Sequence, residues 1–162
     1  MKRREQGRQI ALQALYQLDV RREEVGPEIV EFLRSSTTDP DVYFFARRLT
    51  EGAWAWRAQA DRLIREAAEH WRIERMATID RNILRLAAYE ISQCPDIPSR
   101  VAIDQAIELA KRFSAAESGA FVNGVLDRVL RIVKGEEAAK AAEASPAPGG
   151  PVKKADDPGP QR

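Results

Sequence analysis

The chain has 162 residues, 44% of them hydrophobic, which suits one folded domain. One cysteine (Cys94) and one histidine (His70) exclude an intramolecular disulfide and a zinc site with several Cys or His ligands. The net charge is +1, yet residues 1–22 hold six Lys and Arg against two acids, which gives this segment a net charge of +4. No run of apolar residues is long enough to cross a bilayer or to form a signal peptide, so we expect a cytoplasmic protein.

Apolar residues recur at helical spacing through the first half of the chain. A first helix is predicted from about Arg4 to Arg22, and a short helix follows Gly26-Pro27. Asp39-Pro40 predicts the start of the next helix, with Asp39 as the N-cap. Its apolar series continues for about 30 residues, to Trp71, and Gly52 is the position where such a helix would bend.

The second half of the chain predicts three more helices. Thr78 is the expected cap of a helix over 79–93 that is apolar on several sides, which is typical of a buried central helix. After a loop with two prolines, Ser99 is the expected cap of a helix over 100–113. Residues 114–117 have the spacing of a capping box that opens the last helix, and Gly135 is its expected stop. No segment alternates with period two, so the fold class is all-α.

Residues 136–162 contain almost no large apolar side chains. Such a segment cannot offset the entropy of ordering, so we predict a disordered tail. The expected organisation is one helical domain over 1–135, followed by the tail over 136–162.

The usual marks of an enzyme are absent from the sequence. It has no glycine-rich phosphate loop, no nucleophile elbow and no HExxH motif. Cys94 lies beside Pro95 in a predicted turn, and nothing in the sequence indicates that it is activated. We therefore predict a binding protein without catalytic residues, metal or cofactor.

Two segments carry the functional hypotheses. The N-terminal arginines form either an unremarkable basic terminus or an arm that folds on a phosphate ligand. Gly124, within the predicted last helix, costs about 1 kcal/mol relative to alanine, which favours a close helix–helix approach beside Asn123. Phe121 is either a core residue or a stacking platform for an RNA base.

Five stretches, in order and spread over residues 3–134, resemble the NusB family. They are ALQALY (11–16), DVYF (41–44), IDRNILRLAAYE (79–90), the segment from Ile97-Pro98 through VAIDQAIELAK (101–111), and FVNGVLD (121–127). The resemblance implies an all-helical fold of about seven helices in two packed subdomains. It also implies a transcription antitermination factor that binds boxA RNA as a heterodimer with the ribosomal protein NusE, alongside NusA, NusG and RNA polymerase, in the transcription of ribosomal RNA.

The resemblance also implies roles for individual residues. Tyr16 and Asp80 match positions that face NusE, and together they are expected on one exposed surface. The remaining matches fall on the RNA surface: Lys2, Arg3, Arg4 and Arg8 in the arm, with Glu117 and Phe121 beyond it. The chain departs from the family at residues 5–7, where Glu, Gln and Gly replace more basic residues.

Three questions stay open at this level. A similar domain begins some RNA cytosine methyltransferases, but this chain has no glycine-rich cofactor-binding region, so it would have to be a fragment of one. A helical protein–protein scaffold without RNA binding is the other alternative. Some family members dimerise, so the chain could be a monomer or a homodimer.

Overall fold

The computed structural model describes residues 2–144, which form seven α-helices and one 3₁₀ turn, with no strand in that range. This confirms the all-α prediction. None of the described helices is long and apolar enough to cross a membrane. The elements are α1 (Arg3–Arg21), α2 (Pro27–Ser35), α3 (Pro40–Ala55), α4 (Arg57–Ala67), η1 (Ile73–Arg75), α5 (Thr78–Gln93), α6 (Ser99–Phe113) and α7 (Ser118–Ala144).

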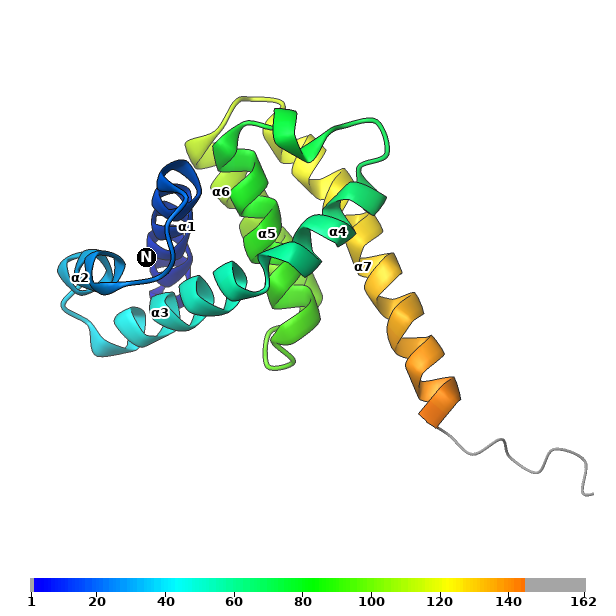
Figure 1. Cartoon of the computed structure of the whole chain (residues 1–162), viewed down its shortest axis with the longest axis horizontal. Coiled ribbons are helices and arrows are strands. Elements are labelled where there is room, and N and C mark those ends of the chain that lie inside the picture. Colours follow the sequence, from blue (N-terminus) through cyan, green and yellow to red (C-terminus); the bar gives the residue numbers. More distant parts are fainter. Residues whose placement is uncertain (1, 145–162) are drawn as a thin grey trace, which may run out of the picture.

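The helices form two packed groups that share α5 (Figure 1). Helices α1, α2 and α3 pack on one another, while α4, α6 and α7 surround α5, which also contacts α1 and α3. The sequence pattern of α5 predicted this central position. Its buried residues include three polar ones, Asn82, Arg85 and Glu90. Buried polar side chains need hydrogen-bond partners inside the protein, and these three find them on α1 and α4.

The predicted helix of about 30 residues is in fact two helices, and that expectation was wrong. Helix α3 ends at Ala55, and Trp56 (φ −93°, ψ 6°) separates it from α4. The reason lies at Gly52, where an added Cβ would overlap the ring of Tyr89 on α5. The chain turns just after this close approach, so α4 leaves in a new direction and packs on α5 and α7 (Figure 1). Helix α4 ends at Ala67, which leaves Trp71 in a loop.

Helix ends agree with the sequence only in part. Asp39 caps α3 as predicted, because its side chain accepts a hydrogen bond from the Asp41 amide at 2.9 Å. Thr78 and Ser99 are instead the first residues of their helices and make no capping bond. The capping box at 114–117 is also absent, since α7 begins at Ser118 and the Ser114 hydroxyl bonds to Asp80.

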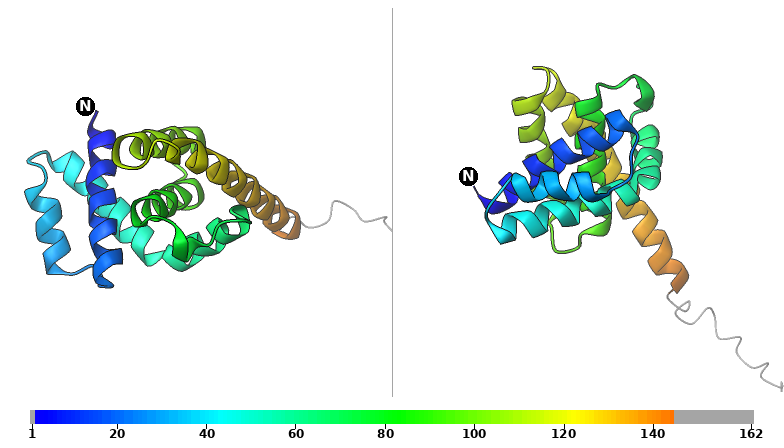
Figure 2. Two further views of the ribbon diagram at one scale, coloured as in Figure 1. Left: turned by 90° about the horizontal axis from the view of Figure 1, so that it is seen from above. Right: turned by 60° about the vertical axis from the view of Figure 1, so that its left-hand side comes forward.

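The predicted stop at Gly135 is wrong as well. Helix α7 continues through it to Ala144 and projects beyond the other helices (Figure 2). Residues 136–144 are therefore helical, although mostly exposed, and not part of a disordered tail. The prediction for 145–162 lies outside the described residues.

Close helix approaches occur at glycines other than Gly124. The nearest atom to a Cβ built on Gly124 is Nη2 of Arg128, at 3.9 Å on the same helix, so no neighbouring helix requires this glycine. Asn123 beside it makes no hydrogen bond through its buried Oδ1 among the described residues. At Gly7, in contrast, a Cβ would lie 2.7 Å from Cδ1 of Phe45. This α1–α3 contact explains a glycine at a position where the resemblance leads one to expect a basic residue.

Candidate nucleic-acid interface

The N-terminal arginines belong to the first two turns of α1, not to an extended arm. Arg3 is exposed and pairs with Asp39 at 2.9 Å and with Asp41 at 3.0 Å. Arg4 is also exposed and lies 3.5 Å from Asp96, with its guanidinium 4.8 Å from the centre of the Phe45 ring. Exposed ion pairs contribute only about 0–1 kcal/mol, so a phosphate could compete with any of these three carboxylates.

Arg8 has a different environment, and its assignment to the RNA surface was wrong. Its side chain is 3% exposed, and Nε donates a 2.8 Å hydrogen bond to Glu90. The guanidinium also lies 5.4 Å from the centre of the Phe45 ring. Burial raises the pKa of the Glu90 carboxyl, against the opposing effect of Arg8. Arg8 therefore neutralises a buried acid between α1 and α5 and is not accessible to a phosphate.

Glu117 and Phe121 lie together at the start of α7. Glu117 is exposed, and its carbonyl accepts a 3.3 Å hydrogen bond from the Phe121 amide. Phe121 is half-buried against the core, with its ring 5.6 Å from that of Trp71 in an edge-to-face arrangement. These residues line a pocket of about 260 Å³, here called the aromatic pocket, with Trp71, Arg75, Met76, Ala77, Asp80 and Ser118. Phe121 thus packs on the core and also lines a surface pocket, and its role as a stacking platform for an RNA base stays a prediction.

Asp80, predicted to face a protein partner, lies in this same pocket. Its two carboxylate oxygens accept hydrogen bonds from Ser114 at 2.5 Å and Ser118 at 3.1 Å. The two hydroxyls are 2.9 Å apart. Asp80 therefore holds the turn between α6 and α7, from which Glu117 projects.

Tyr16, the other predicted partner residue, is 43% exposed on α1. Three residues further along α1, Asp19 pairs with Arg81 at 2.8 Å and accepts a 2.9 Å hydrogen bond from Asn82. Burial raises the pKa of the Asp19 carboxyl. The hydrogen bonds from Asn82 and Arg81, together with the positive charge of Arg85, lower it by more, so the pKa is below its usual value. Tyr16 thus lies near the same end of α5 as Asp80, while the Asp80 carboxylate turns toward the α6–α7 side.

The expected RNA residues fall into two groups at opposite ends of α5. Arg4 contacts Asp96 just beyond the last residue of α5, and Asp80 lies in the first turn of that helix. A helix of 16 residues is about 24 Å long. Between the groups lies a pocket of about 300 Å³ that joins α1 to α6 and is lined by Glu5, Gln9, Gln105, Glu108, Leu109, Lys111 and Arg112. A ligand that contacts both groups must therefore be extended.

Sequence reasoning missed one prominent residue of this surface. Trp71 was taken as the last apolar residue of a long helix, but it is 62% exposed in the loop between α4 and α5. The signal was present in His70-Trp71-Arg72, an aromatic residue flanked by polar and basic ones rather than by apolar neighbours.

Two features would indicate catalysis in the described part of the chain, a metal cluster and an activated cysteine. Residues 2–144 contain no group of three or more His, Cys, Asp or Glu side chains that could hold a metal ion. Cys94 is buried, and burial raises the pKa of its thiol, which is the opposite of what a reactive cysteine requires.

The comparisons with known proteins agree on one family. The NusB family model matches residues 5–131. A transcription antitermination protein NusB from Symbiobacterium thermophilum is 46% identical over 148 residues, which cover 86% of this chain and 96% of the relative. The structure of T. maritima NusB is 36% identical with a TM-score of 0.72, covering 86% of this chain and 98% of that chain. A further structure, of the antitermination factors NusB and NusE in complex with dsRNA, is 27% identical with a TM-score of 0.72, covering 82% and 98%. The chain belongs to the NusB family.

Proposed function

We propose that this protein is a cytoplasmic, non-catalytic antitermination factor that binds single-stranded boxA-type RNA together with NusE and supports transcription of ribosomal RNA. The observation that carries the proposal is the aromatic pocket, where Phe121 and Glu117 lie together on the surface beside Trp71. A half-buried aromatic ring beside a carboxylate suits an unpaired base, because the ring stacks on the base while the carboxylate accepts from its edge.

The exposed cations of α1 supply the second part of the RNA surface. Lys2, Arg3 and Arg4 remain assigned to it, and Arg8 is withdrawn because it is buried against Glu90. The proposed path between these cations and the aromatic pocket follows the pocket between α1 and α6, where Arg112 and Lys111 lie beside Glu5 and Glu108, the latter 3.6 Å from Lys111. An extended single strand fits such a path better than a duplex, whose bases are paired and stacked.

NusE is the proposed protein partner, with Tyr16 as its contact on α1. A solved structure that resembles this chain contains NusB and NusE in complex with dsRNA. Because Asp80 lines the aromatic pocket while Arg81 and Asn82 beside it contact Asp19 on α1, NusE and RNA would occupy adjoining surfaces. Such a pair would then join NusA, NusG and RNA polymerase. A homodimer that covers the RNA surface would compete with this assembly.

A fluorescence anisotropy titration tests the proposal. A labelled boxA-like RNA and a scrambled RNA of equal composition are titrated with the full chain, with and without NusE, at several salt concentrations. We expect tighter binding of the boxA-like RNA, a further gain with NusE, and affinity that falls as salt rises. Equal affinity for both RNAs would contradict boxA recognition. If the chain bound NusE but bound neither RNA at any salt concentration, the scaffold alternative would be favoured.

The variant Phe121→Ala locates the site. Loss of a base stack is expected to cost about 1–3 kcal/mol of RNA binding. The stability cost should stay below the roughly 3–5 kcal/mol of a fully buried phenylalanine, because Phe121 is only half-buried. Thermal melting and RNA titration of the same variant separate the two effects. Unchanged RNA affinity in the folded variant would remove Phe121 from the RNA surface.

A further inference from the structure

The loop between α4 and α5 presents an indole to solvent beside the ring of Phe121. Trp71 is 62% exposed, whereas Trp54 is 5% exposed and Trp56 is half-buried against the core. The Trp71 amide donates a 3.0 Å hydrogen bond to the Ala68 carbonyl, and Ile73, two residues on, is buried. The edge-to-face contact with Phe121 holds the ring itself. An indole with most of its surface exposed to water and one contact to a neighbouring ring can bind a flat apolar group.

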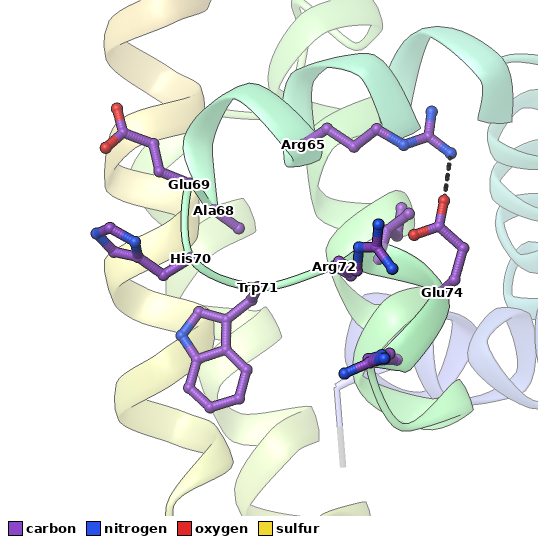
Figure 3. Close-up of a pocket in the computed structure, with 9 residues that line it drawn as sticks. Arg65, Ala68, Glu69, His70, Trp71, Arg72 and Glu74 are labelled. Atoms are coloured by element: carbon purple, nitrogen blue, oxygen red, sulfur yellow. Dashed lines mark hydrogen bonds and ion pairs between the residues drawn. The ribbon is translucent and has the colours of Figure 1, made fainter.

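Trp71 separates two hollows on this face of the molecule. One is the aromatic pocket. The other, here called the loop pocket, has a volume of about 570 Å³ and is enclosed by the loop and by the end of α4 (Figure 3). Trp71 and Arg75 line both pockets. A group stacked on the indole can therefore have its substituents in either hollow.

The charges around the loop pocket favour an anionic ligand. Arg65 is neutralised by Glu74 at 3.1 Å (Figure 3). Arg72 and Arg75 are exposed, and within residues 2–144 neither has a carboxylate oxygen within 4.0 Å. Two acidic side chains line this pocket. Glu74 is paired with Arg65, and Glu69 has no cationic group within 4.0 Å among the described residues. Two available guanidinium groups beside an exposed indole match a phosphate next to a base.

We propose that Trp71, Arg72 and Arg75 form a further subsite for single-stranded RNA, in which one unpaired base stacks on the indole and the adjacent phosphates bind the two arginines. This subsite rests on the proposed RNA-binding function and extends the surface of Glu117 and Phe121 onto the α4–α5 loop. An unpaired base is required, because only a strand with separated bases exposes a face to an aromatic ring.

Three variants test the stacking contact. Trp71→Ala removes the ring, Trp71→Phe keeps an aromatic face, and Phe44→Ala removes an aromatic residue of similar exposure, 64%, on α3. The probe is the boxA-like RNA described above, titrated by anisotropy in the presence of NusE. We expect Trp71→Ala to weaken binding by about 5- to 150-fold, the usual range for one base stack, while Trp71→Phe retains most of the affinity and Phe44→Ala all of it.

Tryptophan fluorescence distinguishes direct stacking from an indirect effect through Phe121. Because Trp71 is the most exposed of the three tryptophans, RNA should quench the emission of the wild-type protein. That quench should disappear in Trp71→Phe even though this variant still binds RNA. Binding without any quench in the wild type would overturn the stacking contact.

The arginines are tested by the salt dependence of binding. Arg72→Gln and Arg75→Gln should each reduce the slope of log affinity against log salt by about 0.7 per phosphate contact. Arg131→Gln, an exposed arginine on α7, should leave the slope unchanged. Full RNA affinity in Trp71→Ala would overturn the subsite and leave the proposed function intact, and loss of NusE binding alone would reassign the loop to the protein partner. Failure of the wild type to bind any RNA would refute both proposals.

Discussion

The two ends of α5 use the same kind of carboxylate for different purposes. At the C-terminal end, here called the closed end, Glu90 is sealed inside the protein with Arg8, next to the contact between Gly52 and Tyr89. At the N-terminal end, the open end, Asp80 is half-buried and holds the turn that borders the aromatic pocket. Burial makes a charge part of the fold, whereas partial exposure leaves the surrounding groups free to meet a ligand.

The largest expected effect is at the closed end. Arg8→Ala leaves Glu90 buried without its partner, which typically costs about 3–5 kcal/mol of stability. The matched control is Arg4→Ala, one turn away but exposed, for which we expect little change. Urea denaturation measures both. If the two variants unfolded at the same urea concentration, Arg8 would have to be accessible to solvent after all.

Two glycine variants sharpen the contrast in packing. Gly52→Leu must displace the ring of Tyr89, and overpacking of this kind costs about 1–3 kcal/mol. In Gly124→Leu the added Cβ meets only the flexible side chain of Arg128, at 3.9 Å, and leucine is the better helix former, so stability should hold or rise slightly. The melting temperatures of the two variants are compared with that of the wild type. A larger loss at Gly124 than at Gly52 would contradict the packing described here.

Asp80 and Tyr16 should separate the two ligands of the open end. Asp80→Lys removes the acceptor for Ser114 and Ser118, so we expect weaker RNA binding together with weaker NusE binding. Tyr16→Ala, on exposed α1 surface, should weaken NusE binding alone. Each loss is expected at about 1–2 kcal/mol, close to that of one or two hydrogen bonds. Calorimetric titration with NusE and anisotropy with RNA provide the two measurements, and identical profiles for both variants would rule out this division.

The smallest effect on stability is expected for the exposed arginines of α1. The double variant Arg3→Ala, Arg4→Ala loses exposed ion pairs and the contact of Arg4 with the Phe45 ring, so the melting temperature should fall only slightly. Its RNA affinity should fall for all sequences alike, and the salt slope should flatten by about 0.7 for each lost phosphate contact. Salt titrations of the boxA-like and scrambled RNAs check this. A slope equal to that of the wild type would place the phosphates elsewhere.

Local patterns in the sequence determined the elements of this protein. Helical spacing of apolar residues predicted α1, α2, α5 and α6, and the many-sided apolar pattern of α5 predicted its central position. Asp39-Pro40 predicted the start of α3. These features depend on residues close together in the chain, whose spacing and capping chemistry are independent of the rest of the fold. The order of five motifs along the chain likewise carried the family resemblance, and the family match confirmed it.

The tertiary structure alone decided which side chains are available to a ligand. In the sequence, Arg8 looks like Arg3 and Arg4, but α5 places Glu90 against it and removes it from the surface. Gly52 and Gly7 mark close helix contacts, while Gly124 does not, because only the neighbouring helix determines whether a Cβ fits. Trp71 continued an apolar pattern, yet the end of α4 at Ala67 leaves it exposed beside Phe121. Burial and partnership arise from contacts between distant segments, and no local spacing encodes them.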